Sequence, residues 1–330
     1  MKVCYCYRKK GTGFSLERVF EQIRRDLPSF VSQSEFYCNY GEYRKVSTYI
    51  KNMLDAKKID ADIYHIVGAV NYLAKVFPPE KTVITIHDIG HAYNSNYGLK
   101  GWVMRKIFAE FPFRRAKYLT AISNFTKKEV VDKVGISPDK IRVIHDPVSA
   151  DFVLKSKEIN LRHPRILCFG HMLNKNLRAH AKALEGIDCH LRIIGKLSDD
   201  EINFLNTLDL KYSNVFNISD EQILKEYELC DFLLFASLYE GFGLPVLEAQ
   251  ATGRPVITSD ISPLTEVAEN GSAIMVNPKN IASIRAGVLQ LMNSSTLVDD
   301  IIARGLENVS RFSGKNISAQ YAELYEDILK

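Results

Sequence analysis

The chain has 330 residues, of which 46% are hydrophobic and 25% charged, a composition that excludes a largely disordered protein. Because single hydrophobic cores stop growing near about 250–300 residues, this length predicts two domains. Residues 1–160 hold 27 Lys and Arg against 17 Asp and Glu, a net charge of +10, whereas residues 161–330 carry a net −6. The opposite signs favour a two-domain division and an acidic partner surface for the first half.

The six cysteines are scattered through apolar runs without a C-x-x-C pair or metal-ligand spacing. They predict reduced core residues and no metal site. The sequence enters an apolar run directly after Met1, and no run reaches the roughly 20 apolar residues that a membrane-spanning helix needs. We therefore expect a cytoplasmic protein.

Short apolar runs alternate with amphipathic segments along the whole chain, which is typical of βαβ units. In the first half we expect strands at 2–7, 35–39, 63–67, 82–86, 118–123 and 141–144. In the second half we expect strands at 165–169, 191–194, 214–218, 232–236, 255–259 and 273–276. Each half therefore predicts a Rossmann-like α/β domain with a parallel sheet covered on both faces.

The segment 146–164 shows neither the periodicity of a strand nor that of a helix, and it contains two prolines. We therefore place the linker there, between domains at 1–150 and 151–330. A cleft between the two domains follows from this division. The last segment, 316–330, carries apolar residues at helical spacing and predicts a helix.

The segment E-G-F-G-L-P-V-L-E sets Glu240 and Glu248 eight positions apart around a glycine turn. A buried strand precedes it, and a helix with proline in its first turn follows and stops at Gly253. The start of such a helix favours an anion such as a diphosphate. One carboxylate could then reach the hydroxyls of one part of the ligand, and the other carboxylate could reach hydroxyls across the phosphates. A sugar and a ribose would be such a pair. The plainer alternative is two glutamates that only favour the helix dipole.

With these residues the chain resembles the retaining glycosyltransferases of family 4, whose context E-G-F-G-L-P-x-x-E-A is present in every fixed letter. The match continues through 253–259 and 266–267, and upstream at Gly170 and 175–176. The resemblance implies the GT-B fold, two Rossmann-like domains that face each other across a cleft. It also implies that the second domain binds a nucleotide sugar, that the first binds the acceptor, and that the C-terminal helix returns to the first.

The resemblance assigns roles to individual residues. Glu240 and His87 would position the transferred sugar, Lys175 would stabilise the departing diphosphate, and Glu248 would hold the ribose. The expected donor-binding residues are Gly13, Gly170, His171, Gly195, Ile218, Gly241, Phe242, Gly243, Leu244 and Glu248.

Several of these residues could instead have a purely structural role. The turn at Gly13 could be a simple strand-to-helix connection, His87 could cap a loop, and Lys175 could be a solvated lysine. His171 stands where the family usually has Arg or Thr, which puts one phosphate contact in doubt, because neutral imidazole offers a single donor.

We therefore expect a metal-independent, retaining hexosyltransferase that needs no cofactor and uses a nucleoside diphosphate sugar. Its acceptor would be a glycan or a lipid-linked molecule in bacterial surface polysaccharide synthesis, with no nucleic-acid partner. The alternatives are a nucleotide-sugar epimerase or phosphorylase on the same fold, and a binding subunit without turnover. Measuring the hydrolysis or transfer of a labelled donor would distinguish these classes.

The segment 100–117 interleaves six basic residues with Trp102, Ile107, Phe108, Phe111 and Phe113. It predicts either a contact with an anionic membrane surface, which would make the protein peripheral on the inner membrane face, or an amphipathic helix packed on the first sheet.

Overall fold

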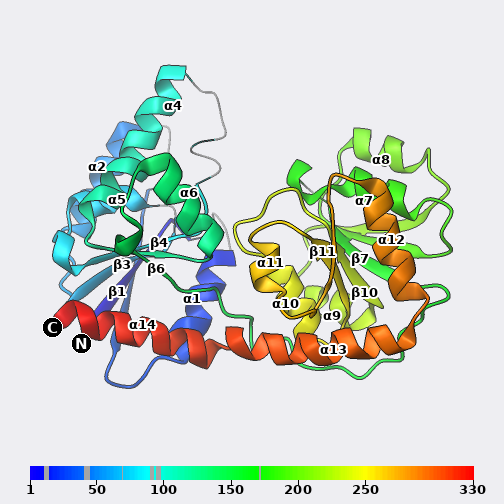
Figure 1. Cartoon of the computed structure of the whole chain (residues 1–330). Helices are drawn as coiled ribbons and strands as arrows, with labels where there is room; N and C mark the ends of the chain where they lie inside the picture. Colours follow the sequence, from blue (N-terminus) through cyan, green and yellow to red (C-terminus); the bar gives the residue numbers. More distant parts are fainter. Residues whose placement is uncertain (11–14, 41–44, 69, 90–92, 94–97, 171) are drawn as a thin grey trace. The chain divides into compact units, whose positions relative to one another are not determined.

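The computed structural model describes residues 1–10, 15–40, 45–68, 70–89, 93, 98–170 and 172–330. Its contacts divide the chain into two compact units. The first comprises Met1–Pro147 and Gly314–Lys330, and the second comprises Val148–Ser313. Each unit contains one six-stranded parallel sheet with helices on both faces (Figure 1). The predicted fold class, two Rossmann-like domains, is confirmed.

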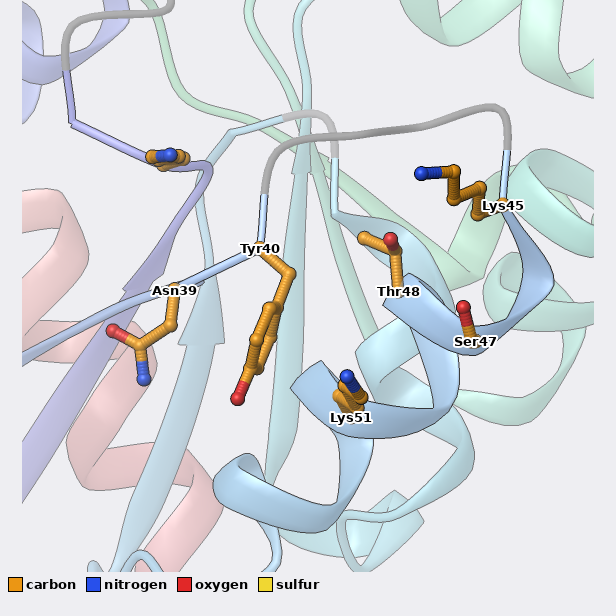
Figure 2. A pocket seen from close by; sticks show the side chains of 7 residues that line it. Asn39, Tyr40, Lys45, Ser47, Thr48 and Lys51 are labelled. Atoms are coloured by element: carbon orange, nitrogen blue, oxygen red, sulfur yellow. The ribbon is translucent and has the colours of Figure 1, made fainter.

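The sheet of the first unit has the order β2-β1-β3-β4-β5-β6. Its strands are β1 (Lys2–Tyr7), β2 (Ser32–Tyr37), β3 (Ile63–Ile66), β4 (Thr82–Ile86), β5 (Tyr118–Ala121) and β6 (Ile141–Val143). Its described helices of eight or more residues are α1 (Ser15–Arg25), α2 (Val46–Ala56), α4 (Gly98–Arg105), α6 (Asn124–Val134) and α14 (Gly314–Leu329). A π-helical turn, Lys106–Glu110, joins α4 to α5 (Phe111–Arg115). A pocket opens beside the start of α2 (Figure 2).

The sheet of the second unit has the order β12-β11-β10-β7-β8-β9. Its strands are β7 (Arg165–Phe169), β8 (His190–Ile194), β9 (Lys211–Val215), β10 (Phe232–Phe235), β11 (Val256–Ser259) and β12 (Ile274–Val276). Its helices are α7 (Leu177–Leu184), α8 (Asp199–Leu205), α9 (Asp220–Leu229), α10 (Leu244–Ala251), α11 (Leu264–Val267), α12 (Ile281–Met292) and α13 (Ser295–Val309). Read from β9, this is the Rossmann order 3-2-1-4-5-6.

The apolar runs predicted the central strands closely, and β1, β4 and β7 have the expected bounds. All four residues of β10 and all five of β4 are buried, as expected for parallel strands covered on both faces. The edge strands β2 and β9 each begin three residues earlier than predicted. Their side chains are mostly half-buried or exposed, so the hydrophobic pattern marks their ends poorly.

A buried polar network holds α14 against the sheet of the first unit. The phenol of Tyr325 lies 3.1 Å from that of Tyr5 and 2.6 Å from Nδ1 of His65. Nε2 of His65 lies 2.7 Å from the hydroxyl of Thr85, which also contacts the phenol of Tyr321 at 3.2 Å. Burial lowers the pKa of His65 to about 3, so its ring is neutral and offers one donor and one acceptor to this network.

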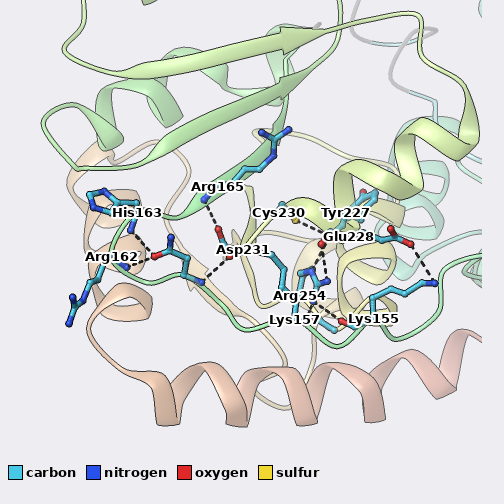
Figure 3. Close-up of polar contacts among 12 residues, drawn as sticks. Lys155, Lys157, Arg162, His163, Arg165, Tyr227, Glu228, Cys230, Asp231 and Arg254 are labelled. Atoms are coloured by element: carbon cyan, nitrogen blue, oxygen red, sulfur yellow. Dashed lines mark hydrogen bonds and ion pairs between the residues drawn. The ribbon is translucent and has the colours of Figure 1, made fainter.

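The segment expected to be a linker lacks helix and strand but packs against the second unit, as Figure 3 shows. The buried carboxylate of Asp231 forms an ion pair with Lys157 and accepts the backbone N–H groups of Asn160 and Arg165 at 2.9 and 2.7 Å. These contacts fix residues 157–165 at the start of β7. The segment is therefore an ordered part of the second unit.

We predict that Tyr325→Phe destabilises the first unit, because His65 and Tyr5 would lose a buried partner. The expected cost is about 1–3 kcal/mol in the free energy of unfolding, measured by urea titration. Tyr37→Phe is the matched control, since the Tyr37 phenol donates to Glu35 at the exposed edge of the sheet. Equal stabilities of the two variants would show that the network contributes nothing net.

Candidate functional site

The turn before α10 requires glycine at position 243. The φ angle of Gly243 is +130°, and a Cβ there would lie 2.6 Å from Cδ2 of Leu264. Both features exclude an L side chain. As predicted, α10 carries a proline in its first turn, and Gly253, with φ of +75°, follows its last turn. The positive end of the α10 dipole therefore directly follows this glycine turn.

Lys175 and Glu240 lie together where the strand order of the second sheet reverses. Lys175 follows β7, Glu240 follows β10, and these two strands are neighbours at the centre of the sheet. The Lys175 Nζ atom donates to Oε1 of Glu240 at 2.7 Å, and the side chains are only 18% and 12% exposed. Nζ also lies 4.7 Å from the ring centroid of Phe235. This reversal is the position where open α/β sheets bind ligands.

The loops that carry this ion pair are joined by side-chain amides. The Nδ2 group of Asn174 donates to the carbonyl of Tyr239 at 2.8 Å. The amide of Asn176 donates to the carbonyls of Ala236 and Pro278 at 3.0 and 2.7 Å. Asn176 has φ of +60°, a left-handed conformation that asparagine tolerates better than most residues. The two loops therefore hold Lys175 and Glu240 in place from both sides.

A buried histidine adds a third connection that the sequence did not reveal. Nε2 of His180, on α7, accepts the backbone N–H of Ala236 at 3.1 Å, just after β10. Burial lowers the pKa of His180 to about 4, so the ring stays neutral and can accept this bond. The sequence signal was a lone histidine on the buried face of a helix, which carries little information by itself.

Glu248 is oriented by a residue from the preceding helix. The fully buried phenol of Tyr227 donates to Oε2 of Glu248 at 2.6 Å. Burial, followed by the nearby Glu248 carboxylate, raises the pKa of Tyr227 well above its usual value, so the phenol remains a donor. The sequence did not reveal the role of Tyr227, because a tyrosine on the apolar face of a helix is usually a core residue.

Arg254 fixes the backbone around Tyr227. Its guanidinium is 2% exposed and donates to the carbonyls of Tyr227, Glu228, Gly253 and Lys155 at 3.0–3.1 Å (Figure 3). The planar fork of arginine suits this set of carbonyls, which a lysine could not bind in the same way. The match of residues 253–259 to the family context thus has a structural cause at Arg254.

The other expected donor-binding residues of the second unit lie near the same strand ends. Gly170 follows β7, and a Cβ there would lie 2.8 Å from Cγ2 of Ile193. Gly195 follows β8 with φ of +137°, and its N–H donates to the carbonyl of Val215 at 2.8 Å. Ile218 lies three residues beyond β9 and is half-buried.

Gly241 and Phe242 precede the turn at Gly243, and Leu244 is the first residue of α10. The Phe242 ring is 4% exposed and packs on Phe312 with centroids 5.7 Å apart. Only the backbone of Phe242 is therefore placed to contact a ligand. His171 and Gly13 lie outside the described residues.

His87 follows β4 in the first unit. Its Nε2 lies 3.1 Å from the carbonyl of Val67, at the end of β3, and its Nδ1 lies 3.8 Å from Oδ2 of the buried Asp146. Nδ1 has no hydrogen-bond partner among the described residues. The ring thus joins the loops after β3 and β4, and its Nδ1 is buried beside Asp146.

Within the described part of the chain, no group of three His, Cys, Asp or Glu residues could hold a metal ion. All six cysteines are buried, free thiols, as predicted. None of the described helices is long and apolar enough to cross a membrane.

Comparison with known proteins places both units in one family. The model of the glycosyl transferases group 1 matches residues 151–308, and that of glycosyltransferase family 4 matches residues 10–152. The O-antigen chain mannosyltransferase B of Escherichia coli is 26% identical over 270 residues, which cover 75% of this chain and 70% of that protein. The serotype-specific mannosyltransferase WbdA of E. coli is 27% identical over 282 residues, which cover 76% of this chain but only 34% of WbdA.

Solved structures share the fold at lower identity. A glycosyltransferase from Rickettsia africae superposes with a TM-score of 0.73 at 20% identity, covering 100% of this chain and 98% of that one. HepE from Anabaena, solved in complex with UDP-glucose, superposes with a TM-score of 0.78 at 15% identity, covering 99% and 100%. Because the two family models together match residues 10–308 and the units have the GT-B fold, the chain belongs to the family 4 type of glycosyltransferases.

Proposed function

We propose that this glycosyltransferase moves a hexose from a nucleoside diphosphate sugar to a glycan or lipid-linked acceptor, with retention of configuration, in bacterial surface polysaccharide synthesis. The observation that carries the proposal is the ion pair of Lys175 and Glu240 at the reversal of strand order. It brings a cation for phosphate and a carboxylate for sugar hydroxyls to the place where α/β sheets bind nucleotides. Similarity to O-antigen mannosyltransferases supports the pathway.

In the proposed reaction the bond between the anomeric carbon and the β-phosphate oxygen breaks. The acceptor oxygen bonds to the same face of that carbon, and its proton passes to the departing phosphate. Negative charge grows on the diphosphate as the bond lengthens, so Lys175 and the positive end of α10 stabilise the transition state more than the ground state. Glu240 and His87 orient the sugar.

Donor recognition would depend on Glu248 as the ligand of the ribose hydroxyls. Tyr227 donates to Oε2 of Glu248 and fixes the direction of the carboxylate. Thermal shift with UDP-, GDP- and ADP-sugars identifies the donor base, since a ligand at 100 times its Kd stabilises by about 2.7 kcal/mol. NMR of the anomeric centre in the product tests retention, and an inverted product would contradict the proposed mechanism.

With the donor identified, Glu248→Ala should raise its Kd about 10- to 150-fold, because a hydrogen bond to a charged group contributes about 1.5–3 kcal/mol. Tyr227→Phe should raise the Kd less, since the carboxylate stays but loses its orientation. Tyr212→Phe is the control, because the Tyr212 phenol donates to Asn206, at 2.8 Å, in an exposed contact. Donor binding that is unchanged in Glu248→Ala excludes the ribose assignment.

Lys175→Ala should lower kcat more than donor affinity, by roughly 10²–10³-fold, because the contact strengthens as charge develops. Lys182→Ala on α7 is the control, since Nζ of Lys182 lies 5.9 Å from the ring centroid of Phe204. Turnover of Lys175→Ala at the wild-type rate would contradict the role of Lys175.

The wild-type enzyme should keep its activity in excess EDTA, because Lys175 and the α10 dipole take the role that a divalent cation has elsewhere. A loss of activity in EDTA that Mg²⁺ or Mn²⁺ restores would contradict metal independence.

We also propose that the first unit binds the acceptor and that segment 100–117 contacts an anionic membrane surface at the cytoplasmic face. Trp102, Val103, Met104 and Phe111 are 39–50% exposed, whereas Phe113 is buried. Part of this segment thus packs against the first unit, as the alternative of an amphipathic helix predicts, and the exposed part could contact lipid.

Two of its arginines have other partners. Arg114 donates to the carbonyl of Val134 at 2.6 Å, and Arg115 donates to those of Ala74 and Phe77 at 2.8 and 3.3 Å. Replacing these arginines would disturb the fold, so the exposed apolar residues are the better target.

We predict that the protein binds anionic vesicles at low salt and that Trp102→Ser with Met104→Ser weakens this binding in a sedimentation assay. The binding should fall with ionic strength, since each basic side chain near anionic lipid contributes about 1 kcal/mol through a screened interaction. Leu289→Ser, at an exposed position on α12, controls for loss of any surface apolar group. Absent binding at low salt, or binding unaffected by the double change, would point to a soluble acceptor.

A further inference from the structure

The chain enters the second unit through residues 148–157, the entry segment, which contains no helix or strand. Val153 and Leu154 of this segment are 50% and 57% exposed, whereas Phe152 is half-buried. The ring of Phe152 lies edge-on against the ring of Tyr227, with centroids 5.4 Å apart and planes at 90°. Because the phenol of Tyr227 donates to Glu248, the entry segment reaches the support of the donor motif in one step.

The orientation of the Tyr227 ring decides where its phenol points. The phenol oxygen lies 2.6 Å from Oε2 of Glu248 and 3.4 Å from the carbonyl oxygen of Pro245, so two acceptors are within reach. Besides Phe152, the ring of Phe169 lies near Tyr227, with centroids 6.4 Å apart. An edge-to-face contact between aromatic rings is directional. Phe152 therefore favours one orientation of the Tyr227 ring, the one that directs the phenol to Glu248.

The backbone of the entry segment is bound to the same support. The carbonyl of Lys155 accepts the Arg254 guanidinium at 3.1 Å, and Arg254 also donates to the carbonyl of Tyr227 at 3.0 Å (Figure 3). The N–H of Lys155 donates to the carbonyl of Thr252 at 3.3 Å. The hydroxyl of Thr252 in turn donates to the carbonyl of Glu248 at 2.7 Å. The segment is thus fixed at Tyr227 and at the end of α10.

The beginning of the entry segment is fixed as well. The N–H of Val148 donates to the carbonyl of Phe312 at 3.0 Å, and the ring of Phe312 packs on Phe242, just before the turn that starts α10. The N–H of Phe152 donates to the carbonyl of Ser149 at 3.1 Å, which closes a turn directly before the ring. With both ends and this turn fixed, Phe152 has little freedom to leave Tyr227.

We propose that Phe152 is a positioning residue for donor binding. Phe152 holds the ring of Tyr227, and Tyr227 directs the carboxylate of Glu248 to the ribose hydroxyls of the nucleoside diphosphate sugar. A hydrogen bond to a ligand weakens when its protein partner is displaced by a fraction of an ångström, so loss of the ring contact lowers affinity without removing any group that touches the ligand. This inference rests on the proposed role of Glu248, whereas the contact of Phe152 with Tyr227 does not.

Phe152→Leu tests the proposal, because leucine keeps an apolar side chain at this position but removes the ring. We expect the Kd of the nucleoside diphosphate that binds best among UDP, GDP and ADP to rise about three- to tenfold, measured by isothermal titration calorimetry. The rise should not exceed that of Tyr227→Phe, which removes the hydrogen bond itself. Phe204→Leu is the matched control, since Phe204 is also half-buried in the second unit but packs against the guanidinium of Arg178 at 4.5 Å.

A double-mutant cycle separates positioning from a general structural effect. In the Glu248→Ala background, Phe152→Leu should leave the Kd unchanged, because no carboxylate remains to be oriented. A general disturbance of the unit would instead raise the Kd by the same factor in both backgrounds. At saturating donor the kcat of Phe152→Leu should stay within about twofold of the wild-type value, since the ribose contact is the same in the ground state and the transition state.

Urea titration establishes that each variant is folded under the conditions of the binding assay. If Phe152→Leu is unfolded there, Phe152→Met provides the same test, because its longer side chain fills more of the space of the ring without offering an aromatic edge. The same rise in Kd and the same loss of the effect in the Glu248→Ala background are expected for this variant.

An unchanged Kd in the variant without the ring, or an equal rise in Kd with and without Glu248, overturns the proposal. If Glu248→Ala weakens nucleotide binding while Phe152→Leu does not, the donor site is retained and only the role of Phe152 is rejected. If wild-type protein binds none of UDP, GDP and ADP, the donor site itself fails, and the role of Phe152 fails with it. The two failures are therefore distinguishable.

Discussion

The ion pair between Lys175 and Glu240 is the interaction on which the candidate site depends. It joins two loops that are 65 residues apart in sequence but follow neighbouring strands. Such a shielded pair is stable only if its geometry is fixed, because desolvation otherwise exceeds the attraction. Asn176 and His180 supply that geometry by bonding to backbone groups after β10. In the proposed reaction, an incoming diphosphate would replace the Glu240 carboxylate as the anionic partner of Lys175.

The second carboxylate of the motif depends on a different set of supports. Glu248 is oriented by Tyr227, and the backbone of Tyr227 is bound by Arg254. Arg254 also donates to the carbonyls of Glu228, in the last turn of α9, and Gly253, which follows α10. A buried guanidinium with only carbonyl partners would be costly if any of them moved, since each donor would lose its acceptor. The proposed donor site is therefore rigid at Glu248, and a substitution at Arg254 would act on donor binding through Tyr227 without touching the donor.

The sequence predicted the two-domain α/β fold, the central strands and the α10 turn because these depend on local patterns: apolar runs, a proline in the first turn of the helix and a glycine after its last turn. It could not predict the contact of Lys175 with Glu240, which requires the strand order, nor the role of Tyr227, which resembles a core residue. The pocket beside α2 was missed for a related reason. Lys9 and Lys51 are ordinary surface lysines until the ends of β1 and β2 bring them to one cavity.

The network around Tyr325 ties the first unit to the last residues of the chain. The first unit ends at Pro147 and resumes at Gly314, so the whole second unit is inserted between its two parts. Tyr5 and His65 lack the phenol of Tyr325 as a hydrogen-bond partner until residues 148–313 have been synthesised. During synthesis the second unit can therefore complete its core first, since domains generally fold as units as they emerge. Helix α14 can cover the sheet of the first unit only after residues 314–329 have been synthesised.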